Sequence, residues 1–148
     1  MVINIKSNKY KGRFGLAMAI AYFTDNVYTV STPLNDTHWY DLIVEKDGVF
    51  KTVQCKCTDS NKNSINFRSC GGTNGGVYDS ILNHQSLDYL FCTDLSGNMY
   101  LIPIEKIRQS GNTRQIVLRT KPTSNNQGFQ TYLYMVKFSF DNNHNDIG

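Results

Sequence analysis

The sequence predicts a single α/β domain in which a mixed central β-sheet carries an N-terminal helix on one face. Three observations support this fold class. Residues 14–23 form an apolar run with the length of a helix, and residues 41–56 form two strand-like runs around a tight-turn dipeptide. A second pair of strand-like runs follows over residues 87–103. The 148 residues suffice for one packed core, so we expect one domain over residues 1–148.

The N-terminal part of the chain should supply a helix and a first strand. Residues 1–8 could form a short strand or a flexible arm, and the basic residues 9–13 precede the helix signal. Residues 14–23 are apolar almost all round, so we expect this helix to be largely buried against the sheet. Residues 25–26 should end the helix, and residues 27–31 are rich in β-formers and should form a strand.

Residues 41–56 should form a β-hairpin. The dipeptide Asp47-Gly48 separates two apolar-rich runs, and Asp-Gly favours the positive backbone dihedrals of a two-residue hairpin loop. If these two residues form the loop, Lys46 pairs with Val49, and the register of the whole hairpin follows from that pair.

Three polar side chains should converge at the open end of this hairpin. The register places Asp41 opposite Gln54, and side-chain alternation places Gln54 and Lys56 on the same face as Asp41. Magnesium prefers oxygen ligands, and Asp41, Gln54 and the backbone carbonyl of Cys55 could supply them. Lys56 would position or deprotonate an attacking water and stabilise charge on a phosphorus centre. On spacing alone, an amphipathic hairpin with ordinary surface polar residues is the simpler interpretation.

The second half of the chain should supply further strands, and the hairpin over residues 87–103 should extend the sheet. Residues 64–68 alternate as a strand does, residues 87–92 read as a buried strand, and a turn at residues 96–98 leads into a strand at residues 99–103. The glycine-rich residues 70–76 form a loop without the Gly-Lys-Ser/Thr of a phosphate-binding loop.

The C-terminal part is less regular. Residues 104–107 open a short helix or turn, and residues 128–140 are compatible with a helix or a last strand. The asparagine-rich residues 141–148 should form a disordered tail.

Composition limits the class of protein. The net charge of +3 does not by itself indicate a nucleic-acid-binding protein. No apolar run approaches the ~20 residues of a membrane span, and no signal-peptide pattern is present, so we expect an intracellular protein without a membrane partner. Cys55, Cys57, Cys70 and Cys92 include no C-x-x-C pair, which favours buried reduced thiols over a zinc or redox site.

One segment of the chain is much more basic than the net charge of the whole protein suggests. Residues 106–121 carry lysines and arginines but no acidic residue. The residues that we expect to contact the phosphates of a nucleic acid are Lys11, Arg13, Arg68, Arg108, Arg114, Arg119 and Lys121. The alternative is a solvated edge strand that its charges protect from pairing with another chain.

The hairpin and the helix before it resemble the core of PD-(D/E)XK nucleases, in the variant where glutamine replaces the second acid. They are similar in particular to group I intron-encoded homing endonucleases, which carry a G-x-A-x-A-type helix, a loop that ends in Tyr-Asp, and V-Q-x-K. The matching residues are Gly15, Ala17, Ala19, Tyr40, Asp41, Val53, Gln54, Cys55 and Lys56.

This resemblance implies a restriction-endonuclease-like fold, with a mixed central sheet flanked by helices. It implies a magnesium-dependent DNA endonuclease, in which Mn²⁺ can replace Mg²⁺ and Asp41, Gln54 and Lys56 form the active site. The substrate would be double-stranded DNA. A double-strand break would require a dimer or a larger homo-oligomer. The protein would act in the cytoplasm of a bacterial, phage or organellar host.

One difference from the family concerns the first helix. Many relatives carry a glutamate there that joins the metal ligands, whereas residues 14–19 of this chain offer no acid. This difference makes a protein without catalytic activity credible, and two alternatives to the homing endonuclease stay open. The protein could be a resolvase of branched DNA (Holliday junctions), or a catalytically silent DNA-binding module built on the same fold.

Overall fold

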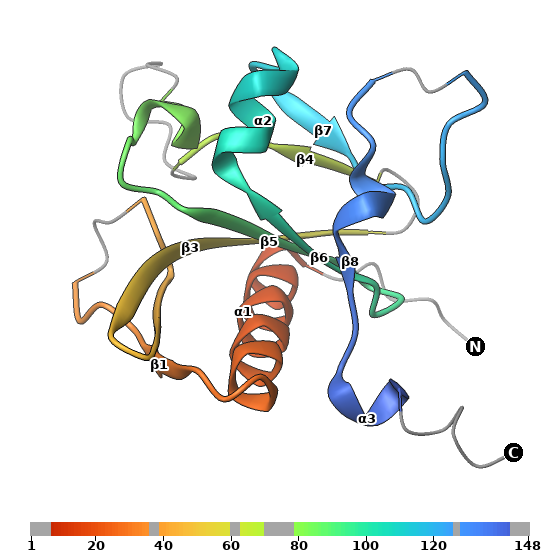
Figure 1. Ribbon diagram of the computed structural model, residues 1–148. Coiled ribbons are helices and arrows are strands. Elements are labelled where there is room, and N and C mark those ends of the chain that lie inside the picture. Colours follow the sequence, from red (N-terminus) through yellow and green to blue (C-terminus); the bar gives the residue numbers. More distant parts are fainter. Residues whose placement is uncertain (1–6, 36–38, 60–62, 70–78, 126–127, 143–148) are drawn as a thin grey trace, which may run out of the picture.

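Within the part of the chain that the computed structural model describes (residues 7–35, 39–59, 63–69, 79–125 and 128–142), a six-stranded mixed sheet lies between helices (Figure 1). The elements in chain order are α1 (Asn8–Asp25), β1 (Thr29–Ser31), β2 (Leu42–Lys46), β3 (Val49–Thr58), β4 (Ser64–Asn66), the 3-10 helix η2 (Ile81–Asn83), β5 (Tyr89–Asp94), β6 (Met99–Pro103), α2 (Ile104–Ser110), β7 (Gln115–Val117), the 3-10 helix η3 (Thr131–Tyr134), β8 (Met135–Val136) and α3 (Ser139–Asn142). This architecture confirms the predicted fold class.

The sheet has the strand order β1-β2-β3-β5-β6-β8. The β3 and β5 strands are parallel, and the other neighbouring strands are antiparallel. Helix α1 covers one face of the sheet, whereas α2 lies on the other face together with the small antiparallel sheet of β4 and β7 (Figure 1). The sequence did not predict this second sheet.

Side-chain alternation along β5 divides the interior into two cores. Phe91 packs with Ala19 and Phe23 of α1, whereas Leu90 and Cys92 belong to the cluster beneath α2 and the β4–β7 sheet. The strands at the centre of the sheet are therefore covered on both faces, as expected where strands run parallel.

Helix α1 begins earlier than its apolar run suggests. The Oγ atom of Ser7 accepts a hydrogen bond of 3.1 Å from the backbone N–H of Tyr10 and caps the helix. The basic residues 9–13 thus lie inside the helix. The expectation of a largely buried helix is wrong, because only the stripe Gly15, Ala19 and Phe23 is buried and the remaining side chains are partly or fully exposed. This four-residue spacing is that of one helix face lying on a sheet.

The β2–β3 hairpin has the predicted register. Lys46 pairs with Val49, and the pairs continue to Leu42 and Val53. Asp47 and Gly48 have φ angles of 53° and 80°, the left-handed conformation that a two-residue type I′ loop requires at both positions. This turn chemistry explains why the hairpin could be predicted residue by residue.

The end of α1 is closed by a Schellman motif. The backbone N–H of Val27 donates to the carbonyl of Thr24 and that of Tyr28 donates to the carbonyl of Phe23, each at 3.0 Å. The rings of Phe23 and Tyr28 meet edge to face at 5.3 Å and supply the accompanying apolar contact. Val27 occupies the left-handed position of the motif, with φ at 67° and a side chain that is 78% exposed.

The C-terminal segment returns to the core and to α1. The buried hydroxyl of Thr131 accepts from the backbone N–H of Arg119 at 2.8 Å and donates to the carbonyl of Val117 at 2.9 Å. At the start of α3, the backbone N–H and the hydroxyl of Ser139 both donate to the Asp25 carboxylate at 2.7 Å. These hydrogen bonds lower the pKa of Asp25.

Some sequence-based expectations fall on parts of the chain outside the description. They concern the glycine-rich loop and most of the N-terminal arm and the C-terminal tail; Ser7 and Asn8 of the arm belong to α1 and its cap, and Asp141 and Asn142 of the tail belong to α3. Among the described helices, none has the length and apolar character needed to cross a membrane.

We predict that Val27→Gly will raise the free energy of unfolding by about 1 kcal/mol. A left-handed conformation costs a residue with a Cβ roughly 1–2 kcal/mol, and the greater chain entropy of unfolded glycine offsets only part of that gain. Denaturant titration measures the change. The control is Val49→Gly at another exposed valine, located at the start of β3, which should lower stability. A loss of stability in Val27→Gly would contradict this account.

Candidate active site

Asp41 is anchored to the central strand through both its backbone and its side chain. It directly precedes β2, and its N–H donates to the carbonyl of Val53 at 2.8 Å. Its Oδ2 atom accepts a hydrogen bond of 2.8 Å from the backbone N–H of Cys55. The carboxylate is therefore held against β3 at the residue between Gln54 and Lys56, as the predicted register requires.

Gln54 presents a buried acceptor without a donor. Its side chain is 7% exposed, and among the described residues its Oε1 atom is a buried side-chain oxygen with no hydrogen-bond partner. Burying an amide oxygen without a partner costs about 1–3 kcal/mol, so buried acceptors are normally satisfied. A bound cation would satisfy this oxygen. The residue opposite Gln54 in the hairpin is Asp41, whose carboxylate is anchored to β3.

Lys56 is held by the chain beyond β4. Its Nζ atom donates to the backbone carbonyl of Arg68 at 2.6 Å. Arg68 in turn forms an isolated β-bridge with Ser80. The ammonium group of this partly buried residue is thus restrained rather than left to sample many rotamers.

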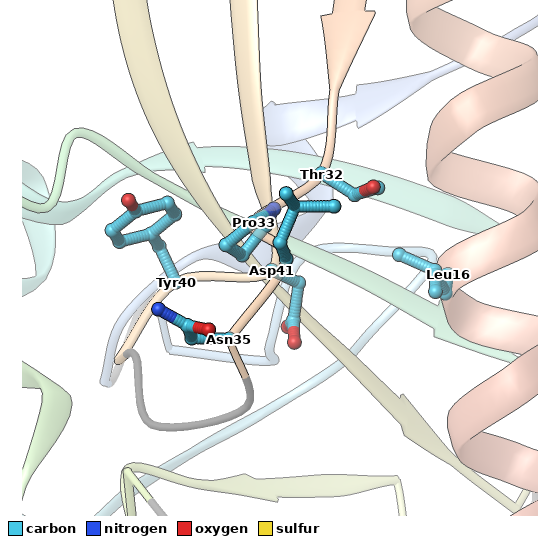
Figure 2. Close-up of a pocket in the computed structure, with 7 residues that line it drawn as sticks. Leu16, Thr32, Pro33, Asn35, Tyr40 and Asp41 are labelled. Carbon is cyan, nitrogen blue, oxygen red and sulfur yellow. The ribbon is translucent and has the colours of Figure 1, made fainter.

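A pocket of about 320 Å³ adjoins Asp41 (Figure 2). Its lining comprises Leu16, Thr32, Pro33, Leu34, Asn35, Tyr40 and Asp41. Figure 2 shows Asp41 between Tyr40 on one side and Leu16 of α1 on the other. The wall that α1 contributes is therefore apolar, and Asp41 is the acid among the lining residues.

The donor set suits magnesium better than a softer metal. In the described part of the chain, no group of three or more histidine, cysteine, aspartate or glutamate residues could hold a metal ion. One carboxylate, one amide oxygen and a backbone carbonyl are hard ligands, and Mg²⁺ commonly uses few protein ligands and keeps several waters. Asp41, Gln54 and the carbonyl of Cys55 offer donors of this chemical kind.

The described thiols are unsuited to metal or redox chemistry. Burial raises the pKa of Cys55 and of Cys92, and it raises the pKa of Cys57 to about 11. A thiol must lose its proton to bind metal or attack a disulfide, so these groups are inert at neutral pH. Cys57 has a packing role instead. It lies so close to α1 that a Cβ atom added to Gly15 would be 3.1 Å from the Cβ atom of Cys57.

The predicted basic residues have different environments. Lys11 forms an ion pair of 3.7 Å with Asp59, and Arg13 is exposed on α1. The guanidinium group of Arg108 donates to the backbone carbonyls of Leu82 and His84 at 2.9–3.3 Å, so it secures this segment of the fold.

The remaining predicted phosphate contacts gather on the second sheet. Arg68 follows β4, and Arg114, Arg119 and Lys121 flank β7; all four are exposed. The backbone N–H of Phe67 donates to the carbonyl of Arg114 at 2.9 Å, which joins the two arginine-bearing segments. Because Arg68 also holds Lys56, this basic surface adjoins the candidate site.

A second polar cluster lies next to the site, and sequence reasoning missed it. Oδ2 of Asp79 accepts from the hydroxyl of Ser69 at 2.6 Å and lies 3.0 Å from Nε2 of His84. The hydrogen bond from Ser69, followed by that with His84, lowers the pKa of Asp79. The His84 ring stacks on Trp39 at 5.1 Å. No sequence motif joins these residues, because their proximity depends on tertiary packing.

Comparison with known proteins gives two findings. A family model described as PD-(D/E)XK endonuclease matches residues 6–141. The solved structure of a bacterial homing endonuclease, I-Ssp6803I, is similar to this chain with a TM-score of 0.68 and 21% sequence identity, over 88% of this chain and 89% of that chain. At this identity the structural likeness shows a shared fold. None of the curated proteins compared matches the chain.

We predict that Gln54→Met will stabilise the metal-free protein and weaken metal binding. The substitution keeps the length of the side chain and removes the buried oxygen, so the free energy of unfolding in EDTA should rise by about 1 kcal/mol. Thermal unfolding in EDTA and calorimetric titration with Mg²⁺ or Mn²⁺ measure the two effects.

The matched variant is Gln54→Glu. It should keep or tighten metal binding, because it adds a negative charge at the same place. Unchanged metal affinity in Gln54→Met would remove Gln54 from the ligand set.

Proposed function

Because the chain belongs to the PD-(D/E)XK endonuclease family, we propose that it hydrolyses phosphodiester bonds of double-stranded DNA at Asp41, Gln54 and Lys56. The observation that carries this proposal is the buried oxygen of Gln54, which has no hydrogen-bond partner among the described residues, on the strand position opposite the anchored Asp41. Such an acceptor is costly in a protein that never binds a cation there. It is useful in one that does.

Asp41, Gln54 and the carbonyl of Cys55 would hold Mg²⁺, or Mn²⁺ in its place. When bound, the ion would polarise a phosphoryl oxygen and lower the pKa of a coordinated water. The chain itself fixes the ligands beforehand, because the N–H of Cys55 orients the Asp41 carboxylate and the sheet orients Gln54. This preorganisation reduces the reorganisation needed when the substrate reacts.

Lys56 would act on the water and on the phosphate. Its ammonium group donates a hydrogen bond to the Arg68 carbonyl. That contact directs the group without neutralising it, since a carbonyl is uncharged. The positive charge would stabilise negative charge on phosphorus as the new P–O bond forms and the old one breaks.

DNA would lie across the second sheet, where Arg68, Arg114, Arg119 and Lys121 would contact phosphates. One site of this kind cuts one strand, so a double-strand break calls for a homodimer or a larger homo-oligomer with sites facing the two strands. We further propose a site-specific homing endonuclease of the group I intron type, which the hairpin motif and the fold shared with I-Ssp6803I support.

One observation favours a second candidate function. Leu16 places an apolar side chain on the wall of the pocket that faces Asp41, where an acid would add a metal ligand. A protein that binds DNA but no longer cuts it would tolerate such a wall. The alternative is therefore a catalytically silent DNA-binding module on the nuclease fold.

DNA cleavage gives the most direct test of the proposed function. The protein should nick or linearise a supercoiled plasmid library that carries candidate targets in the presence of Mg²⁺, and EDTA or Asp41→Ala should abolish the reaction. Gel electrophoresis separates the products. Cutting of four-way junctions alone would identify a resolvase, and DNA binding without any cutting would identify the silent module.

Lys56→Ala should lower the cleavage rate by about 100-fold or more, the scale on which a single transition-state contact acts, while leaving DNA affinity nearly unchanged. Lys51→Ala is the matched control, because Lys51 is a partly buried lysine on the same strand with no assigned role. Single-turnover kinetics and a binding titration separate the two effects. A cleavage rate in Lys56→Ala as high as that in Lys51→Ala would exclude Lys56 from the mechanism.

A further prediction concerns the basic surface. Replacing Arg114, Arg119 or Lys121 by alanine should each reduce the slope of log affinity against log salt by about 0.9. Lys137→Ala removes the same charge from an exposed position after β8 and should leave the slope unchanged. Fluorescence anisotropy over a salt series measures the slope. An equal loss at Lys137 would indicate that net charge, rather than this surface, determines binding.

A further inference from the structure

The support of Lys56 depends on two short segments, residues 67–69 and residues 79–81, whose backbones pair with each other. We call this pairing the crossing. Its ammonium group binds the backbone carbonyl of Arg68, and this backbone is held by the segment around Ser80. The N–H of Ser69 donates to the carbonyl of Asp79 at 2.8 Å, and that of Ile81 donates to the carbonyl of Phe67 at 2.7 Å. The position of the Lys56 tip is therefore set by how these segments are fastened together.

The side chain of Asp79 adds a hydrogen bond between the two paired segments. Its Oδ2 atom accepts a hydrogen bond of 2.6 Å from the hydroxyl of Ser69. Ser69 directly follows Arg68, whose carbonyl binds Lys56. Its Oδ1 atom lies 3.4 Å from the amide nitrogen of Asn83. A charged acceptor makes stronger hydrogen bonds than a neutral one, so this carboxylate is the strongest side-chain link that the structure shows across the crossing.

The same carboxylate reaches the other half of the site. Its contact with Nε2 of His84 at 3.0 Å fixes an imidazole that stacks on Trp39, with ring planes 13° apart. The Trp39 ring packs edge to face on Tyr40 at 4.9 Å, and Tyr40 lines the pocket beside Asp41. The backbone of His84 is held in turn by the guanidinium group of Arg108 at 2.9 Å.

We infer that Asp79 is a positioning residue for the proposed hydrolysis, holding the backbone that supports Lys56 in register with the aromatic side chains beside Asp41. The inference rests on the proposed function. The Asp79 carboxylate contacts Ser69, Asn83 and His84, and it acts on the proposed site through them. It acts by keeping the ammonium group and the carboxylate at a fixed separation, and small errors in such a separation cost much of the rate.

The decisive variant is Asp79→Ala. Its kcat should fall by about 10- to 100-fold, while the KM for DNA and the affinity for Mn²⁺ stay near those of the unaltered protein. Asp79→Asn keeps an oxygen for the Ser69 hydroxyl and should recover most of the rate. Ser69→Ala, which removes one arm of the contact, should give an intermediate loss.

The matched control is Asp88→Ala. The Asp88 carboxylate also anchors a backbone group, accepting the N–H of Thr52 at 2.9 Å, but at the opposite end of β3 from Lys56. Its replacement should lower thermal stability and leave kcat unchanged. Loss of rate that merely follows loss of stability would then appear in both variants.

A readout that does not require cleavage is available, because Trp39 is the single tryptophan of the chain. Release of His84 in Asp79→Ala should unstack the indole and increase its quenching by acrylamide, whereas Asp88→Ala should not. An unaltered protein that cuts DNA together with an Asp79→Ala variant of native kcat would overturn the inference and leave the proposed function standing. An unaltered protein that cuts no DNA would overturn both. Increased quenching with a lower kcat at constant KM is the expected result.

Discussion

The hydrogen bond from the backbone of Cys55 to the carboxylate of Asp41 is the constraint on which the candidate site depends. It extends the β2–β3 ladder by one contact, with a side chain as the acceptor. The carboxylate is thereby tied to a backbone position rather than to another flexible side chain. Since β3 lies between β2 and β5, that position is in the middle of the sheet and paired on both sides.

The two faces of β3 have separate tasks, and strand alternation keeps them apart. Cys55 and Cys57 point toward α1, where Gly15 allows the helix backbone to approach closely. Gln54 and Lys56 alternate with them, and the Lys56 tip contacts the Arg68 carbonyl next to the second sheet. Packing against α1 therefore uses one face of β3, whereas the site also extends to α1 at Asp41, where Leu16 lines the adjoining pocket.

The parts of this arrangement that sequence could predict are those specified by local chemistry. Asp47-Gly48 dictates a type I′ loop, and from that loop the pairing of Asp41 with Gln54 follows by counting. The start of α1 was misplaced because a single capping hydroxyl, that of Ser7, outweighs the polar character of the turn that follows. The burial of α1 was overestimated because apolar composition does not reveal which face meets a sheet.

The parts that sequence could not predict join residues far apart in the chain. The parallel pairing of β3 with β5 and the antiparallel pairing of β4 with β7 have no turn of their own to signal them. The contacts of Asp79 with Ser69 and His84 arise only after those strands are in place. Local signals specify elements, whereas the separation between elements is set by packing in three dimensions.

The parallel pair at the centre of the sheet has a consequence for folding kinetics. Each flanking hairpin, β2–β3 and β5–β6, closes through a turn of a few residues and can form on the microsecond scale typical of hairpins. Joining them pairs Val53 with Tyr89, which requires closure of a much longer loop and slows the step. Asp41 and Gln54 therefore come together early, within one hairpin. The contacts that support Lys56 lie in the connection between β3 and β5, so they should form with the docking of the two hairpins.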